Sequence, residues 1–192
     1  MKKLLTIIGA RPQIIKAAAL NRAIRSKFPD SLIEVLVHTG QHYDHGMSDI
    51  FFEEMGISKP DYQLGIGSGS HGIQTGKMLE EIERVVNLER PDALVIYGDT
   101  NSTLAGALAA SKIHVPVIHI EAGLRSYNKR MPEEINRITS DHASTLLYSP
   151  TKAGVNNLEK EGFHSLETAR LRGTADINNP YVFHCGDLMY DN

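Results

Sequence analysis

Runs of consecutive apolar residues alternate along the chain with longer segments in which apolar residues recur every three or four positions. The first pattern is typical of strands covered on both faces, and the second of helices that bury one face. Their alternation predicts an α/β fold, a Rossmann-like parallel sheet with helices on both faces. We expect strands at residues 4–8, 33–37, 93–97, 117–120, 146–148 and 182–184. We expect helices at residues 12–27, 48–55, 73–89, 102–113, 132–144 and 152–162.

The composition is that of an ordinary globular protein. Of the 192 residues, 41% are hydrophobic and 22% are charged, which excludes disordered and low-complexity classes. The length suits one large domain, so we expect residues 1–192 to form a single Rossmann-like domain. The irregular polar stretch at residues 163–179 is expected to be a mobile surface excursion before the last strand.

Charge and cysteine content narrow the function further. The chain has 20 Lys and Arg against 23 Asp and Glu, and this net charge of −3 argues against nucleic-acid binding. The single cysteine, Cys185, excludes an internal disulfide and a cysteine-based zinc site. We therefore expect a cytoplasmic protein.

The first residues superficially resemble a secretion signal, because Lys2 and Lys3 precede an apolar stretch. Arg11 and Lys16 interrupt that stretch after about seven residues, whereas a membrane span needs about 18. We expect neither a cleaved leader nor a membrane partner.

Residues 67–72 match the pattern GxGxxG, with Asp92 about 20 residues further on. A dinucleotide site would need a buried strand directly upstream, and residues 61–64 are short and polar. The acid should also end the next strand, but Asp92 precedes one. We interpret the segment as a flexible connection, which could still close over a ligand, and expect no cofactor.

Cationic residues follow the first predicted strand in the turn Gly9-Ala10-Arg11-Pro12. Parallel strands gather ligands at their carboxyl ends, where helix N-termini present free N–H groups to anions. Gly9 would allow close approach of a phosphate, and Arg11 and Lys16 would bind its oxygens. The alternative is an ordinary turn with solvated cations.

Carboxylates follow the next predicted strand ends. Asp99 comes after residues 93–97, Glu121 comes directly after 117–120, and Glu133 begins the helix at 132–144. Simpler explanations exist for some of them, because Asp99 could cap a helix, and Glu133 and Glu134 could complement a helix dipole. Acids converging from different strands on one rim are nevertheless typical of α/β catalytic sites, and this favours acid–base chemistry.

The histidines and the possible nucleophiles do not indicate a further kind of chemistry. His38, His42 and His45 straddle a strand end without a zinc-ligand signature, so we expect no metal site. The segment Thr39-Gly40-Gln41-His42 is better suited to hydrogen-bonding a polar ligand. No serine or cysteine nucleophile motif is present.

Together these motifs resemble the non-hydrolysing UDP-N-acetylglucosamine 2-epimerase family. The matching segments are Gly9-Ala10-Arg11-Pro12 with Lys16, Thr39-Gly40-Gln41-His42, Gly98-Asp99-Thr100, His119-Ile120-Glu121-Ala122-Gly123-Leu124-Arg125 and Pro132-Glu133-Glu134-Ile135-Asn136-Arg137. The resemblance implies one half of a two-domain GT-B architecture. This chain would be the N-terminal half, with the interdomain hinge starting near residues 186–192, and would be inactive alone.

The resemblance also implies the chemistry. The family removes the C2 proton of a UDP-sugar, expels UDP to leave a glycal, and then reverses both steps on the opposite face of the sugar. Carried over by motif, Asp99, Glu121 and Glu133 would be the catalytic acids and bases. The implied substrate-binding residues are Arg11, Lys16, Gln41, His42, Arg125 and Arg137. The implied partners are a C-terminal domain and a second copy, because the family is typically dimeric.

Two departures bear on the substrate. Many family members have Gly-Thr-Arg-Pro-Glu where this chain has Gly9-Ala10-Arg11-Pro12-Gln13, and its connection from Arg125 to Pro132 is shorter. These features resemble the branch that acts on UDP-2,3-diacetamido-2,3-dideoxyglucuronate. A non-catalytic nucleotide-sugar-binding module and a GT-B glycosyltransferase remain alternatives.

Overall fold

A computed structural model describes residues 1–41, 52, 55–165 and 175–188. Within them, eight parallel strands form one sheet in the order β3-β2-β1-β4-β5-β6-β8-β7. The strands are β1 (Lys2–Ile8), β2 (Leu32–His38), β3 (Tyr62–Gln63), β4 (Ala93–Tyr97), β5 (Val117–Ile120), β6 (Leu146–Ser149), β7 (His164–Ser165) and β8 (Tyr181–His184). The helices in the same residues are α1 (Arg11–Lys27), α3 (His71–Glu89), α4 (Asn101–Lys112), α5 (Pro132–His142) and α6 (Lys152–Lys160). The predicted Rossmann-like class is confirmed.

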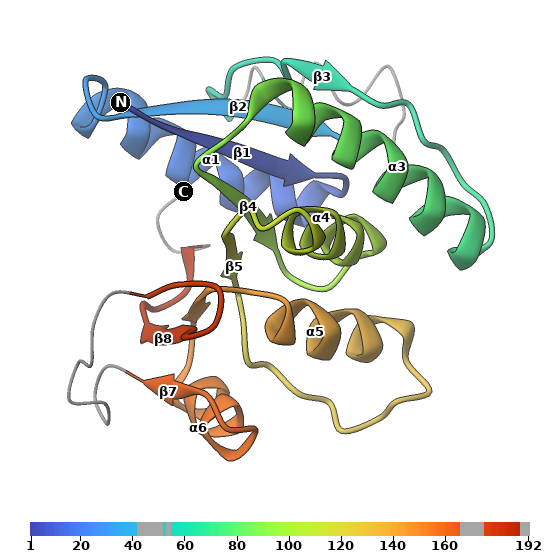
Figure 1. The fold of residues 1–192 in the computed structure, drawn as a ribbon, viewed down its shortest axis with the longest axis vertical. Helices are drawn as coiled ribbons and strands as arrows, with labels where there is room; N and C mark the ends of the chain where they lie inside the picture. The colour runs from blue at the N-terminus through green and yellow to red at the C-terminus, as the bar shows by residue number, and fades with distance from the viewer. Residues whose placement is uncertain (42–51, 53–54, 166–174, 189–192) are drawn as a thin grey trace.

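The helices cover both faces of the sheet. Figure 1 shows α1 on the opposite side of β1 from α3 and α4. On the α1 face, Ile14 and Ala18 pack with Val95 and Tyr97 of β4. None of the described helices is long and apolar enough to cross a membrane.

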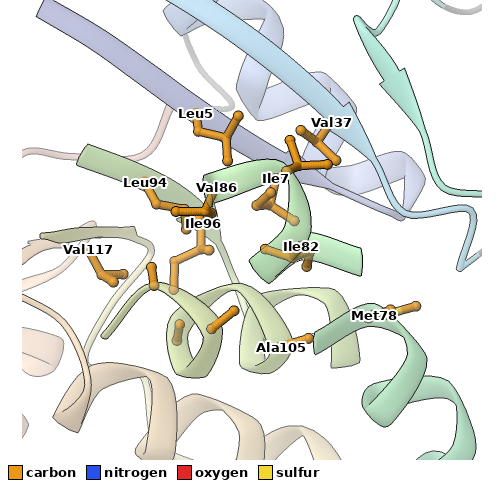
Figure 2. Close-up of a cluster of buried hydrophobic side chains, with 14 of the residues drawn as sticks. Leu5, Ile7, Val37, Met78, Ile82, Val86, Leu94, Ile96, Ala105 and Val117 are labelled. Carbon is orange, nitrogen blue, oxygen red and sulfur yellow. The ribbon is translucent and has the colours of Figure 1, made fainter. Parts of the chain in front are cut away.

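The largest buried cluster lies on the other face. Figure 2 shows Val86 of α3 beside Leu94 and Ile96 of β4, and Met78 and Ile82 of the same helix belong to this cluster. Alternate residues of the central strands therefore supply the two cores, which is why runs of consecutive apolar residues mark these strands in the sequence. This packing fixes the strand ends that carry the candidate site.

Some predicted elements differ from the structure, and others fall on residues that the structure does not describe. The strands β3 and β7 were not expected, because two residues at a sheet edge leave no periodic pattern. β7 begins the stretch 163–179 that we expected to be an excursion, and residues 166–174 within it lie outside the description. The helix expected at residues 48–55 also lies almost wholly outside it.

Candidate active site

The candidate site lies at the carboxyl ends of β1, β4 and β5. Strand order reverses between β1 and β4, and open parallel sheets bind ligands in the crevice at such a switch point. β1 leads into α1, β4 leads through Gly98 and Asp99 into α4, and β5 ends directly before Glu121. The topology therefore brings together residues as far apart in the chain as Lys16 and Glu121, which are separated by 105 positions.

Lys16 and Glu121 form an ion pair across this edge. Lys16 Nζ bonds Glu121 Oε2, and the side chains are 11% and 28% exposed. A Cβ atom on Gly98 would lie 3.1 Å from the same carboxylate oxygen, so Glu121 lies over the Gly98 backbone. Lys16, which we predicted to bind phosphate, therefore contacts Glu121, which we predicted to act as a catalytic acid or base.

Asp99 pairs with Arg137 of α5, the second ion pair of the site. Asn136 supports the same loop by donating to the Asp99 carbonyl at 3.0 Å. The N-cap of α4 is Thr100, whose hydroxyl accepts from Thr103 N. Because Thr100 caps the helix, the capping explanation does not account for Asp99.

Glu133 and Glu134 face different surroundings. Glu133 is exposed, whereas Glu134 is 1% exposed and accepts from the backbone N–H groups of Ser126 and Tyr127, both at 2.9 Å. Arg137 Nη1 lies 2.6 Å from Glu134 Oε2, so one guanidinium bridges Glu134 and Asp99. Burial alone would raise the pKa of Glu134, but those N–H groups and the Arg137 charge hold it below its ordinary value.

Sequence reasoning did not single out Glu134 as a site residue. The available signal was its spacing of three residues from Arg137, which puts the two side chains on one helix face. The helix-dipole explanation treats Glu133 and Glu134 alike, so it did not predict that Glu134 is buried and Glu133 exposed.

Arg11 and Gln13 occupy the start of α1. Arg11 is exposed, whereas Gln13 is buried. Gln13 Oε1 accepts from Gly9 N at 2.8 Å, and its Nε2 donates to the Tyr97 carbonyl at 2.8 Å. Because its amide accepts through the oxygen and donates through the nitrogen, Gln13 joins the turn after β1 to the end of β4.

Gln41 also contacts protein at this edge. Its Oε1 accepts from Ser102 N at 3.1 Å and from Ser102 Oγ at 2.7 Å. A Cβ on Gly9 would lie 2.2 Å from the Thr39 and Ser102 hydroxyl oxygens, which explains the glycine. His42 and His45, two of the histidines considered above, lie outside the described residues.

Arg125 has a different environment from the other predicted substrate contacts. Its guanidinium lies 2.7 Å from Asp141 and 2.8 Å from Glu161, and its side chain is 1% exposed. The structure therefore places Arg125 between the carboxylates of Asp141 and Glu161.

Of the residues considered for metal and dinucleotide sites, the structure describes His38 and Asp92. No group of three or more His, Cys, Asp or Glu side chains in the described part of the chain could hold a metal ion. His38 is 1% exposed, and burial lowers its pKa to about 4. Asp92 accepts from Lys3 N at 2.8 Å just before β4 begins, at the opposite edge of the sheet from the candidate site.

The glycine-rich segment borders a pocket of about 400 Å³ formed with α3. Gln74 joins this segment to α4, since it donates to the Gly67 carbonyl at 3.0 Å and accepts from Asn101 at 2.8 Å. Closure of the segment over a ligand stays a prediction.

Comparisons with known proteins agree with one another. The sequence pattern of a family described as UDP-N-acetylglucosamine 2-epimerase matches residues 27–192. A UDP-2,3-diacetamido-2,3-dideoxy-D-glucuronate 2-epimerase from Pseudomonas aeruginosa is 58% identical over 190 residues, 99% of this chain and 50% of the relative. A UDP-N-acetylglucosamine 2-epimerase from Methanococcus maripaludis is 53% identical over 162 residues, 84% of this chain and 43% of the relative.

Solved structures are similar as well. The crystal structure of Methanocaldococcus jannaschii UDP-GlcNAc 2-epimerase in complex with UDP-GlcNAc and UDP matches with a TM-score of 0.81 and 47% identity. The match covers 95% of this chain and 46% of that one. The chain spans about half the length of the relatives it matches, as one half of a GT-B architecture would.

Proposed function

Because the chain belongs to the UDP-N-acetylglucosamine 2-epimerase family, we propose that it is the N-terminal part of an enzyme that inverts C2 of a UDP-linked acetamido sugar. The observation that carries the proposal is the pairing of Asp99 with Arg137 and of Glu121 with Lys16 at one edge of the sheet. The second domain and, in a homodimer, a second copy would complete the protein.

The proposed reaction divides naturally among these groups. In elimination the C2–H and C1–O bonds break, a C1–C2 double bond forms, a carboxylate takes the proton, and UDP leaves with the bonding electrons. Re-addition returns UDP to C1 and a proton to the opposite face of C2. Two faces require proton-transfer groups on both sides, and Asp99, Glu121 and Glu133 are the candidates on this domain.

Proton transfer cannot supply the whole rate enhancement. A positioned acid or base contributes roughly 10²–10⁴-fold, and no carbonyl lies next to C2 to stabilise a carbanion. Stabilisation of the departing diphosphate must add to it. Lys16 suits this role because it reaches the site from α1, and a diphosphate there would compete with Glu121 for the ammonium. Arg11, at the exposed start of α1, is a second candidate.

A specific substrate is favoured by one comparison. The P. aeruginosa relative, named for UDP-2,3-diacetamido-2,3-dideoxy-D-glucuronate, aligns with 99% of this chain, and residue 13 is glutamine as we noted for that branch. We therefore propose this diacetamido sugar as the preferred substrate, with UDP-N-acetylglucosamine as the competing candidate.

The test uses the full-length enzyme in deuterated water with each UDP-sugar in turn. We expect deuterium at C2 and an epimeric product, faster with the diacetamido substrate. Asp99→Asn and Glu121→Gln should each reduce incorporation by about 10²–10⁴-fold, because an amide cannot exchange the proton. The exposed Asp30→Asn variant should match the unmodified enzyme. Full turnover by both site variants would refute the catalytic assignment.

A further inference from the structure

His119 is fully buried in β5, and both of its ring nitrogens face oxygen atoms. Nδ1 lies 2.7 Å from Asp141 Oδ1, and Nε2 lies 2.8 Å from the Gly98 carbonyl oxygen. A carbonyl and a carboxylate can only accept, whereas a neutral imidazole has a single N–H. Satisfying a carboxylate and a carbonyl at once requires an N–H on both nitrogens, which is the imidazolium form.

The surrounding charges fit that state. Asp141 Oδ2 lies 2.7 Å from Arg125 Nη1, so a guanidinium faces the second oxygen of this carboxyl group. Arg125 in turn pairs with Glu161 at 2.8 Å. His142 Nε2 lies 3.2 Å from Glu161 Oε2, so Glu161 faces both Arg125 and His142. A protonated His119 places a positive charge on the other side of Asp141. Buried charges persist when they are paired in this way.

This cluster holds the backbone from which the candidate catalytic carboxylates project. His119 fixes the carbonyl of Gly98, the residue directly before Asp99. Asp141 Oδ2 also accepts from Gly123 N at 3.1 Å, so the two oxygens of one carboxylate hold residues on either side of Glu121. Glu121 itself has φ 74°, a left-handed conformation that persists in a non-glycine residue only when its surroundings impose it.

We propose that His119, held as an imidazolium between Asp141 and the Gly98 carbonyl, is a positioning residue that sets the geometry of Asp99 and Glu121. It does not touch substrate. It acts by fixing two strand ends relative to each other, and Asp141 of α5 completes the clamp. This inference rests on the function proposed above.

The protonation state can be measured directly. In the full-length enzyme labelled with ring-¹⁵N histidine, the His119 signals are those lost in His119→Gln. We expect both nitrogens to be protonated at neutral pH. In Asp141→Asn the amide N–H can donate to Nδ1, so we expect a neutral ring that keeps its bond to Gly98. An unprotonated Nδ1 in the unmodified enzyme would overturn the imidazolium assignment.

Kinetics test the positioning role. We expect His119→Gln and Asp141→Asn to lower kcat for C2 exchange by about 10²-fold, the cost of a small displacement of reacting groups. KM should change by no more than about threefold, because the lost interaction bears on the transition state. The matched control is His164→Gln on the exposed face of β7, with unchanged kcat.

Three results would separate the possibilities. A loss of activity that only parallels the loss of folded protein, measured by thermal unfolding of the same samples, would overturn the positioning role. If His119→Gln does not fold, Asp141→Asn carries the kinetic test, and unchanged kcat there would overturn the role equally. If the unmodified enzyme exchanges no C2 proton, the proposed function fails, while the nitrogen spectrum still decides the state of His119.

Discussion

Arg137 and Asp141 lie one helical turn apart on α5 and reach the ends of two different strands. Arg137 pairs with Asp99 after β4, and Asp141 bonds His119 at the end of β5. A single helix therefore contacts both the Asp99 side chain and the strand that ends directly before Glu121, the two candidate catalytic carboxylates. Side chains four residues apart share a helix face, so the docking of α5 determines both contacts together.

Replacing Arg137 by lysine should separate charge from geometry. A lysine keeps the positive charge but cannot hold Glu134 and Asp99 with a planar fork, so we expect kcat to fall by about 10-fold to 10²-fold. Steady-state kinetics of the full-length enzyme measure the effect. Arg130→Lys, at an exposed position of the preceding loop, should retain full activity. Equal activity of both variants would mean that the bidentate bridge is unimportant.

Gln13→Glu should destabilise the protein. The carboxylate can still accept from Gly9 N but cannot donate to the Tyr97 carbonyl, which would keep only its bond from Thr103 Oγ1. Losing this buried hydrogen bond, with a carboxylate oxygen left facing a carbonyl oxygen, costs about 1–3 kcal/mol. We expect a lower thermal midpoint at pH 8 and a smaller deficit at pH 5, where a protonated carboxyl can donate again. Gln63→Glu, on the exposed edge strand β3, serves as control. A deficit independent of pH would contradict this account.

Glu34 should make stability depend on pH. Burial raises the pKa of this carboxyl above its ordinary value of 4.5, although bonds from Thr6 and Asn21 oppose the shift. The folded state therefore binds the proton more tightly than the unfolded state, and stability falls as pH rises from the ordinary pKa through the raised one. Glu34→Gln removes that ionisation.

We expect the thermal midpoint of Glu34→Gln, relative to the unmodified protein, to rise between pH 4 and pH 8. Asp30→Asn, at an exposed position, should show no such trend. A relative midpoint that falls with pH would reverse the assigned sign.

The sequence was sufficient for most of the fold and part of the site. β4 is apolar throughout and β5 is apolar except for His119, so the bounds of both buried parallel strands could be predicted to the residue. Asp99 and Glu121 followed from the rule that ligands meet parallel strands at their carboxyl ends. The two-residue edge strands could not be found, because their pairing is decided by neighbouring strands.

The contacts of single side chains depend on how helices dock, which periodicity does not encode. Nothing in the spacing shows that Asp141 lies beside His119, or that Arg125 turns towards Glu161 after Gly123, which has φ 82°. The buried contacts of His119, Asp141 and Arg125 could therefore not be predicted from the sequence, whereas Asp99 and Glu121 at the strand ends could.

Substitutions of Glu133 and Glu134 should separate an effect on catalysis from an effect on stability. Glu134 is buried and accepts three hydrogen bonds, including one from Arg137, so Glu134→Gln should lower the thermal midpoint as well as turnover. The loss should correspond to roughly 1–3 kcal/mol, since an amide leaves a buried donor unsatisfied. Glu133 is exposed, and Glu133→Gln should leave the midpoint unchanged while lowering C2 exchange by about 10²-fold or more. Each variant is the control for the other, measured on the same full-length preparation. Normal exchange in Glu133→Gln would remove Glu133 from the proposed acid–base set and leave Asp99 and Glu121 as the carboxylates of this domain.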